Sequence, residues 1–90
     1  MVYLITYDLN NPGQNYDAVI EAIKSASINW CSYWKSSYLI KSNITSANAV
    51  FEKIKPHLDK NDRILVVEVK NNMQGWLEKE AWDYINGSIF

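Results

Sequence analysis

The alternation of apolar and polar residues predicts two well-defined strands. Residues 2–8 (VYLITYD) are rich in β-branched and aromatic side chains and carry apolar groups on both faces, as central strands do. Residues 63–70 (RILVVEVK) alternate more regularly and give the clearest strand pattern in the chain. Between the first strand and the next element, residues 9–15 contain the turn signal Pro12-Gly13 and are predicted to form a loop.

Three other segments have helical character. In residues 16–26 the apolar side chains fall at i, i+3, i+4, i+7 and i+10, so they form one stripe along a helix. Residues 45–57 have a similar stripe, and Pro56 is expected to end or kink that helix. Residues 76–85 (WLEKEAWDYI) predict a short terminal helix or an irregular arm.

The middle of the chain, residues 28–42, has two interpretations. The segments INWCSYW and SSYLIKS both have the composition of strands, which favours a hairpin with strands at 29–33 and 37–41. A single bent strand is the alternative, because the turn between the two segments lacks the Gly or Asn that tight hairpins prefer.

The predicted order is strand, helix, strand, strand, helix, strand, followed by an arm over residues 75–90. With right-handed crossovers this order closes as a ferredoxin-like α+β sandwich in one domain over residues 1–90. Its four-stranded antiparallel sheet has the spatial order 4-1-3-2, with both helices on one face. The other face needs a cover, for which the arm and a second copy of the chain are the candidates. Because a chain of 90 residues buries only about 60–65% of its extended surface, we expect a homodimer.

This topology brings a set of polar residues to one edge of the sheet, where the first strand ends and the third and fourth begin. The set consists of Asp8, Asn10, Ser36, Ser37, Asp62 and Arg63. The carboxylates of Asp8 and Asp62 are candidate ligands for Mg²⁺, which needs only one or two carboxylates besides substrate phosphate oxygens. Such an ion would promote phosphodiester cleavage with Asp8 as the catalytic residue. Alternatively, Asp8 ends a strand and accepts N–H bonds from its own loop.

Three other residues of this edge, Asn10, Ser37 and Arg63, are candidates for binding a substrate.

Aromatic residues are a second group of candidate binding residues, with four Trp, six Tyr and two Phe in the chain. The predicted hairpin contains Trp30, Tyr33, Trp34 and Tyr38. In these positions Trp30 and Trp34 would stack on nucleotide bases, as aromatic residues of sheet-based RNA binders do. Packing in a core or a dimer interface is the alternative and the one we favour.

Charge and cysteine content narrow the classes of function. The formal net charge is −1 and there is no basic tail, which argues against tight nonspecific binding to nucleic acid. RNA at a local basic patch, or a small nucleotide, is still compatible with this charge. The single Cys31 forms no internal disulfide and no multi-cysteine metal site. Together with the lack of a secretory signal or a membrane-spanning apolar run, this predicts a cytoplasmic protein that does not enter a membrane.

Several segments are similar to known protein families. YDLNNPGQNY, NDRILVVEV and GWLEKEAWDYI resemble the small SinR-like proteins of bacteria and phages, a mostly uncharacterised group. More distantly, Tyr7-Asp8 at the end of the first strand, together with the order of elements, resembles the Cas-two-type CRISPR adaptation proteins and their stand-alone relatives. The second resemblance implies a ferredoxin-like homodimer with Asp8 as the catalytic residue and Ser37 as a second position. Some members of that group are metal-dependent endonucleases, and others are structural partners of an integrase.

The sequence therefore supports two hypotheses about function. The first is a nucleic-acid-directed protein that cleaves RNA with Mg²⁺ held by Asp8. The second is a non-catalytic binding protein of phage type, which captures a nucleotide or a host protein with its aromatic surface. The carboxylate at the strand end favours the first hypothesis, and the weak basicity of the chain favours the second.

Overall fold

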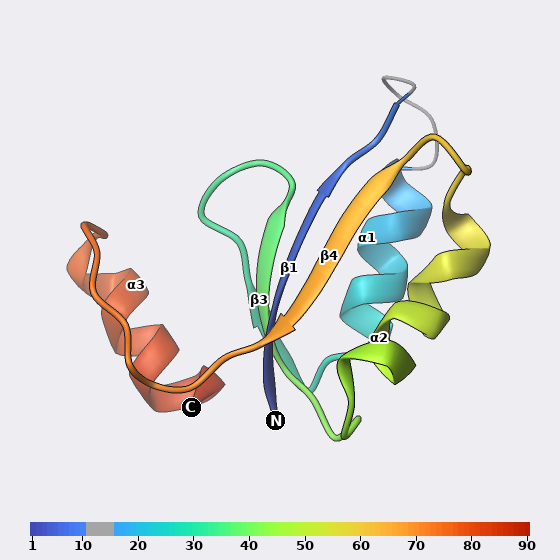
Figure 1. Ribbon diagram of the computed structural model, residues 1–90. Coiled ribbons are helices and arrows are strands. Elements are labelled where there is room, and N and C mark those ends of the chain that lie inside the picture. Colours follow the sequence, from blue (N-terminus) through green and yellow to red (C-terminus); the bar gives the residue numbers. More distant parts are fainter. Residues whose placement is uncertain (11–15) are drawn as a thin grey trace.

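The computed structural model, which describes residues 1–10 and 16–90, places two helices on one face of a four-stranded sheet and a C-terminal arm on the other (Figure 1). The predicted loop residues 11–15 lie outside the described residues. The elements in chain order are β1 (Val2–Asp8), α1 (Tyr16–Ser25), β2 (Asn29–Cys31), β3 (Ser37–Lys41), α2 (Ala47–Ile54), β4 (Arg63–Glu68) and α3 (Lys79–Tyr84). A 3₁₀ turn, Lys55–His57, follows α2, and a π-helical turn, Ile85–Ile89, follows α3.

The sheet has the order β2-β3-β1-β4 with all neighbours antiparallel, so the predicted α+β fold and its strand order are confirmed. The register sets Leu4 of β1 between Leu39 of β3 and Val67 of β4. At the end of β1, Asp8 lies opposite Arg63. Because directly opposed residues point to the same side of a sheet, this register determines which side chains share each face.

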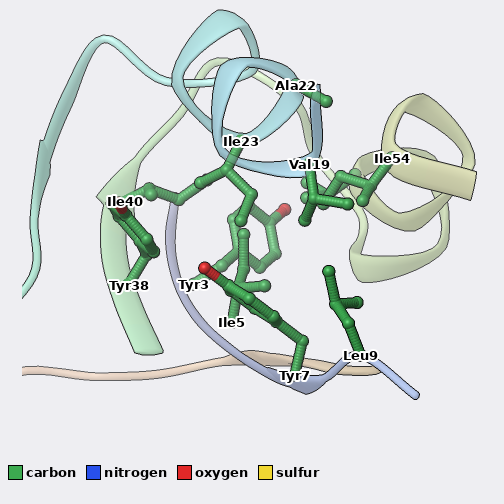
Figure 2. Close-up of a cluster of buried hydrophobic side chains, with 11 residues drawn as sticks. Tyr3, Ile5, Tyr7, Leu9, Val19, Ala22, Ile23, Tyr38, Ile40 and Ile54 are labelled. Carbon is green, nitrogen blue, oxygen red and sulfur yellow. The ribbon is translucent and has the colours of Figure 1, made fainter. Parts of the chain in front are cut away.

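The face toward α1 and α2 holds the larger core (Figure 2). Alternation along β1 points Tyr3, Ile5 and Tyr7 into this core, where all three are buried. The helices contribute the apolar stripes that the sequence predicted, with Val19 and Ile23 from α1 and further side chains from α2. Burial of these stripes accounts for the packing of both helices on one face of the sheet.

The opposite face is only partly covered. A second cluster joins Val2 and Cys31 of the sheet to Ile85 and Ile89 of the arm. The side-chain amide of Asn29 also donates to the backbone oxygen of Ser88 at 2.8 Å. The arm therefore serves as the cover for one end of this face, as predicted. Farther along the face, an uncovered group of apolar side chains is exposed, consisting of Leu4, Leu65 and Val67.

The hairpin interpretation of the middle segment is confirmed, although its first strand is shorter than predicted. β2 ends at Cys31 because the next residue closes the turn: the Ser32 hydroxyl lies 3.0 Å from the backbone oxygen of Trp34 and 2.8 Å from that of Ser37. Ser36 then reverses the chain with a φ of 62°, the left-handed conformation that Gly or Asn usually supplies.

β4 ends at Glu68, before the predicted end of that strand at residue 70. The remaining differences from the predicted boundaries are at helix ends. α2 begins at Ala47, because the Ser46 hydroxyl accepts a hydrogen bond from the N–H of Ala49 at 3.1 Å and caps the helix. At Pro56 the helix tightens into the 3₁₀ turn, as expected for a proline near a helix end. Within the described parts of the chain, no helix has the length and apolar character needed to span a membrane.

Candidate functional site

The carboxylate edge of the sheet forms at the end of β1. Asp8 is exposed, and its register partner Arg63 lies on the same face. Thr6 precedes Asp8 by two residues on the same face of β1, and it is paired with Ser37 of β3. The Ser37 hydroxyl donates to the Thr6 hydroxyl at 3.3 Å. The backbone N–H of Tyr7 donates to the carbonyl of Ser36 at 3.0 Å. These contacts bring the end of β1 next to the starts of β3 and β4.

The carboxylate of Asp62 binds loop backbone at this edge. One of its carboxylate oxygens accepts the backbone N–H of Asn10 at 2.8 Å, and the other accepts the N–H of Asp59, also at 2.8 Å. The guanidinium of Arg63 turns back to the carbonyl of Asp62 at 3.1 Å. Both carboxylate oxygens of Asp62 therefore hold loop backbone, which is a common use of Asp in turns.

Few side chains at this edge could coordinate Mg²⁺. Across residues 1–10 and 16–90, no three His, Cys, Asp or Glu side chains gather closely enough to hold a metal ion. Asp62 is engaged by two backbone N–H groups, which leaves Asp8 as the carboxylate that faces solvent at this edge. Mg²⁺ bound here would depend on one carboxylate, water and the oxygens of a substrate.

A cleft of about 500 Å³ lies between the open face of the sheet and the C-terminal arm, and we call it the aromatic cleft. Its floor includes Leu4 and Leu39 of the sheet. Residues 32–34 of the loop that joins β2 to β3 line one wall, and the arm lines the other. The walls carry four large aromatic side chains: Tyr33, Trp34, Trp76 and Trp82.

Two of these aromatic side chains are poorly covered by the protein. Trp76 is 100% exposed and Trp34 is 60% exposed. They come from segments far apart in the sequence, yet both also line a further hollow between the loop and the start of α3. Trp82 is more enclosed, because it packs in the cluster under the arm. The loop and the arm therefore present indole rings around an apolar space, which is the usual character of a small-ligand site.

Trp30 does not belong to this group. Alternation along β2 points it to the helix face, where its ring lies 5.9 Å from that of Tyr38. The ammonium of Lys24 sits 4.4 Å from the centre of the Trp30 ring, a cation–π contact. Of the two tryptophans proposed from sequence to stack on a ligand, the structure places Trp34 at the aromatic cleft and Trp30, which is 39% exposed, beside Lys24 and Tyr38 on the helix face.

A second cleft, of about 720 Å³, lies on the helix side of the same loop, and we call it the tyrosine cleft. Its lining includes the three tyrosines Tyr7, Tyr16 and Tyr38, together with Lys35 of the loop. Burial, with smaller contributions from Tyr38 and Tyr16, raises the pKa of Tyr7 to about 12, so its phenol stays protonated at neutral pH.

Sequence patterns missed most of the tyrosine cleft. Tyr7 and Tyr16 fit the expected core stripes of β1 and α1, and their rings do approach each other at 6.3 Å between centroids. The sequence feature that could have indicated this cleft is the position of the two tyrosines, at the end of β1 and at the start of α1, where side chains lie at the margin of the core.

Comparison of the chain with known proteins found no matching family model and no similar curated protein.

Proposed function

We propose that this chain is a non-catalytic binding protein that captures a nucleotide by stacking its base in the aromatic cleft. The observation that supports this proposal is the exposure of Trp34 and Trp76 on opposite walls of that cleft. Every nucleobase has a flat π-face, and stacking on an aromatic side chain is worth about 1–3 kcal/mol per base. The two exposed indoles of Trp34 and Trp76, together with the exposed Tyr33, supply enough stacking surface around this cleft to hold a single base.

The charge distribution supports a small ligand over a long nucleic acid. A polymer site needs a row of lysines and arginines to neutralise successive phosphates. The chain has a formal net charge of −1, and the described residues that line the aromatic cleft include no lysine or arginine. Binding in this cleft would therefore depend on stacking and apolar contact, with little dependence on phosphate charge along a strand.

The proposal is tested by calorimetric titration with the common nucleosides and their 5′-monophosphates. We expect at least one base to bind, and Trp34→Ala and Trp76→Ala each to weaken binding by about tenfold, the equivalent of about 1.4 kcal/mol. Trp30→Phe is the matched control, because it removes an indole that does not line the aromatic cleft. Absence of heat with every base, or equal loss in the Trp30 variant, would contradict the proposal.

A second candidate function rests on Asp8. Its carboxylate is exposed at the end of a central strand, opposite Arg63 on the same face. If this protein cleaves RNA, cleavage needs Mg²⁺ or Mn²⁺, stops with a chelator and is lost in Asp8→Asn. Wild-type protein that leaves RNA and DNA intact under all metal conditions removes this candidate and leaves the binding function.

A further inference from the structure

The tyrosine cleft and the aromatic cleft meet at one loop. Residues 32–36 separate them, and the side chains of Tyr33 and Trp34 are part of the lining of both clefts. The aromatic cleft lies on the open face of the sheet, whereas the tyrosine cleft lies over Tyr7 and the start of α1. A ligand that stacks against Trp34 from the first cleft therefore has a second, chemically different cleft within reach around the same side chain.

The hydroxyl groups of the tyrosine cleft are available to a ligand. Tyr7 is 7% exposed and Tyr38 is 9% exposed, yet neither hydroxyl makes a hydrogen bond within residues 1–10 and 16–90. Among these residues, no fully enclosed side-chain oxygen or nitrogen lacks a partner, so each of the two hydroxyls reaches some solvent, and both tyrosines line the cleft. Figure 2 shows the Tyr7 side chain extending along the core toward the side on which Tyr38 lies.

Tyr3 differs from Tyr7 in the hydrogen bonding of its hydroxyl. It lies on the same face of β1 and is completely buried, and its hydroxyl donates to the backbone carbonyl of Ile44 at 2.7 Å. That is the usual arrangement for a buried tyrosine. Tyr7, four residues farther along the strand, is nearly as buried, yet its hydroxyl has no hydrogen-bond partner among the described residues. The difference leaves the Tyr7 hydroxyl open to a ligand in the tyrosine cleft, which Tyr7 lines.

The chemistry of this lining suits an anionic group. A protonated phenol donates a hydrogen bond, and the pKa of Tyr7 lies far above neutral pH, which keeps that donor in place. Lys35 is the charged residue among the described residues that line the cleft, and it brings a positive charge. Hydrogen bonds from such donors to phosphate oxygens are charge-assisted and are about twice as strong as neutral ones.

We propose that the tyrosine cleft receives the phosphate of a nucleoside monophosphate whose base stacks in the aromatic cleft, with Tyr7 and Lys35 as the phosphate ligands. This inference rests on the proposed function and deepens it, because it names the part of the ligand that the second cleft recognises. Trp34 lies between the two subsites and contacts the ligand on both sides of the loop.

The experiment compares a nucleoside with its 5′-monophosphate by calorimetry at low ionic strength. We expect wild-type protein to bind the monophosphate about tenfold more tightly than the nucleoside, a ratio typical of one or two charge-assisted hydrogen bonds. Tyr7→Phe and Lys35→Gln should each bring that ratio close to one without changing nucleoside affinity. Lys35→Arg should keep most of it. Lys60→Gln, an exposed lysine outside the described lining of both clefts, is the control for the loss of one charge.

The outcomes separate the two proposals. Equal affinity of wild-type protein for nucleoside and monophosphate would overturn the phosphate subsite while the base-binding function stands. A preference for the monophosphate that survives Tyr7→Phe and Lys35→Gln would also overturn it, because the phosphate would then bind elsewhere. No binding of either ligand would remove the proposed function and this inference with it. A loss of nucleoside affinity in Tyr7→Phe would show that Tyr7 acts through the loop, and would overturn its role as a phosphate ligand.

Discussion

The carboxylate of Asp62 accepts the backbone N–H of Asn10 at 2.8 Å, and so ties the chain just beyond β1 to the residue before β4. Its other oxygen holds the N–H of Asp59 at 2.8 Å. The acidic residue proposed from sequence as a metal ligand thus has a second explanation, because it fastens two loops at the end of the sheet where Asp8 lies.

This relationship predicts the effect of removing the carboxylate. Asp62→Ala should lower the free energy of unfolding by about 1–2 kcal/mol, because two backbone N–H groups lose a charged acceptor at an exposed site. The measurement is urea unfolding at neutral pH. Asp83→Ala is the control, since its pair with Lys79 is exposed and should be worth about 0.5 kcal/mol or less. Equal effects of the two substitutions would contradict a clamping role for Asp62.

The arm should contribute to stability as part of the fold. Ile89 is completely buried against the open face, so Ile89→Ala should cost about 2–4 kcal/mol of unfolding free energy. Ile28→Ala deletes the same atoms from a side chain that is half exposed, and it should cost less than about 1 kcal/mol. If thermal unfolding finds both variants equally stable, the arm does not hold the position described.

Tyr7 predicts a specific alkaline loss of stability. An unfolded tyrosine ionises near pH 10, whereas burial raises the pKa of Tyr7 to about 12 in the folded protein. Between these values the folded state holds a proton that the unfolded state has released, so stability falls as pH rises through this window. Tyr7→Phe should therefore lose less stability than wild-type protein between pH 9 and 11. Parallel losses in denaturant unfolding at the two pH values would argue against a raised pKa.

Sequence patterns were sufficient for the fold. Alternation in β1 and β4 and the helical stripes of α1 and α2 determine which side chains meet, and the rule of right-handed crossovers leaves few arrangements besides the observed strand order. The early end of β2 was not predictable in the same way. It depends on hydrogen bonds of Ser32 and on a positive φ at Ser36, which is a residue with no strong preference for that conformation.

The candidate site was only partly predictable from sequence, for a related physical reason. Local patterns find residues that share a strand or a helix, and they placed Trp34 among the candidates and Asp8 at the edge of the sheet. The aromatic cleft is formed by a loop and an arm that are distant in sequence, so its pairing of Trp34 with Trp76 depends on tertiary packing. Among the described residues no carbonyl accepts a hydrogen bond from the Tyr7 hydroxyl, and the spacing of apolar residues along the chain cannot predict this.

The most direct test of the account is to follow the four tryptophan indole N–H signals by NMR while a nucleoside monophosphate is added. If a base binds in the aromatic cleft, the signals of Trp34 and Trp76 shift with a common, saturable dependence on ligand concentration, while that of Trp30 stays in place. A titration that moves no indole signal, or that moves only the signal of Trp30, would contradict the binding of a base in the aromatic cleft.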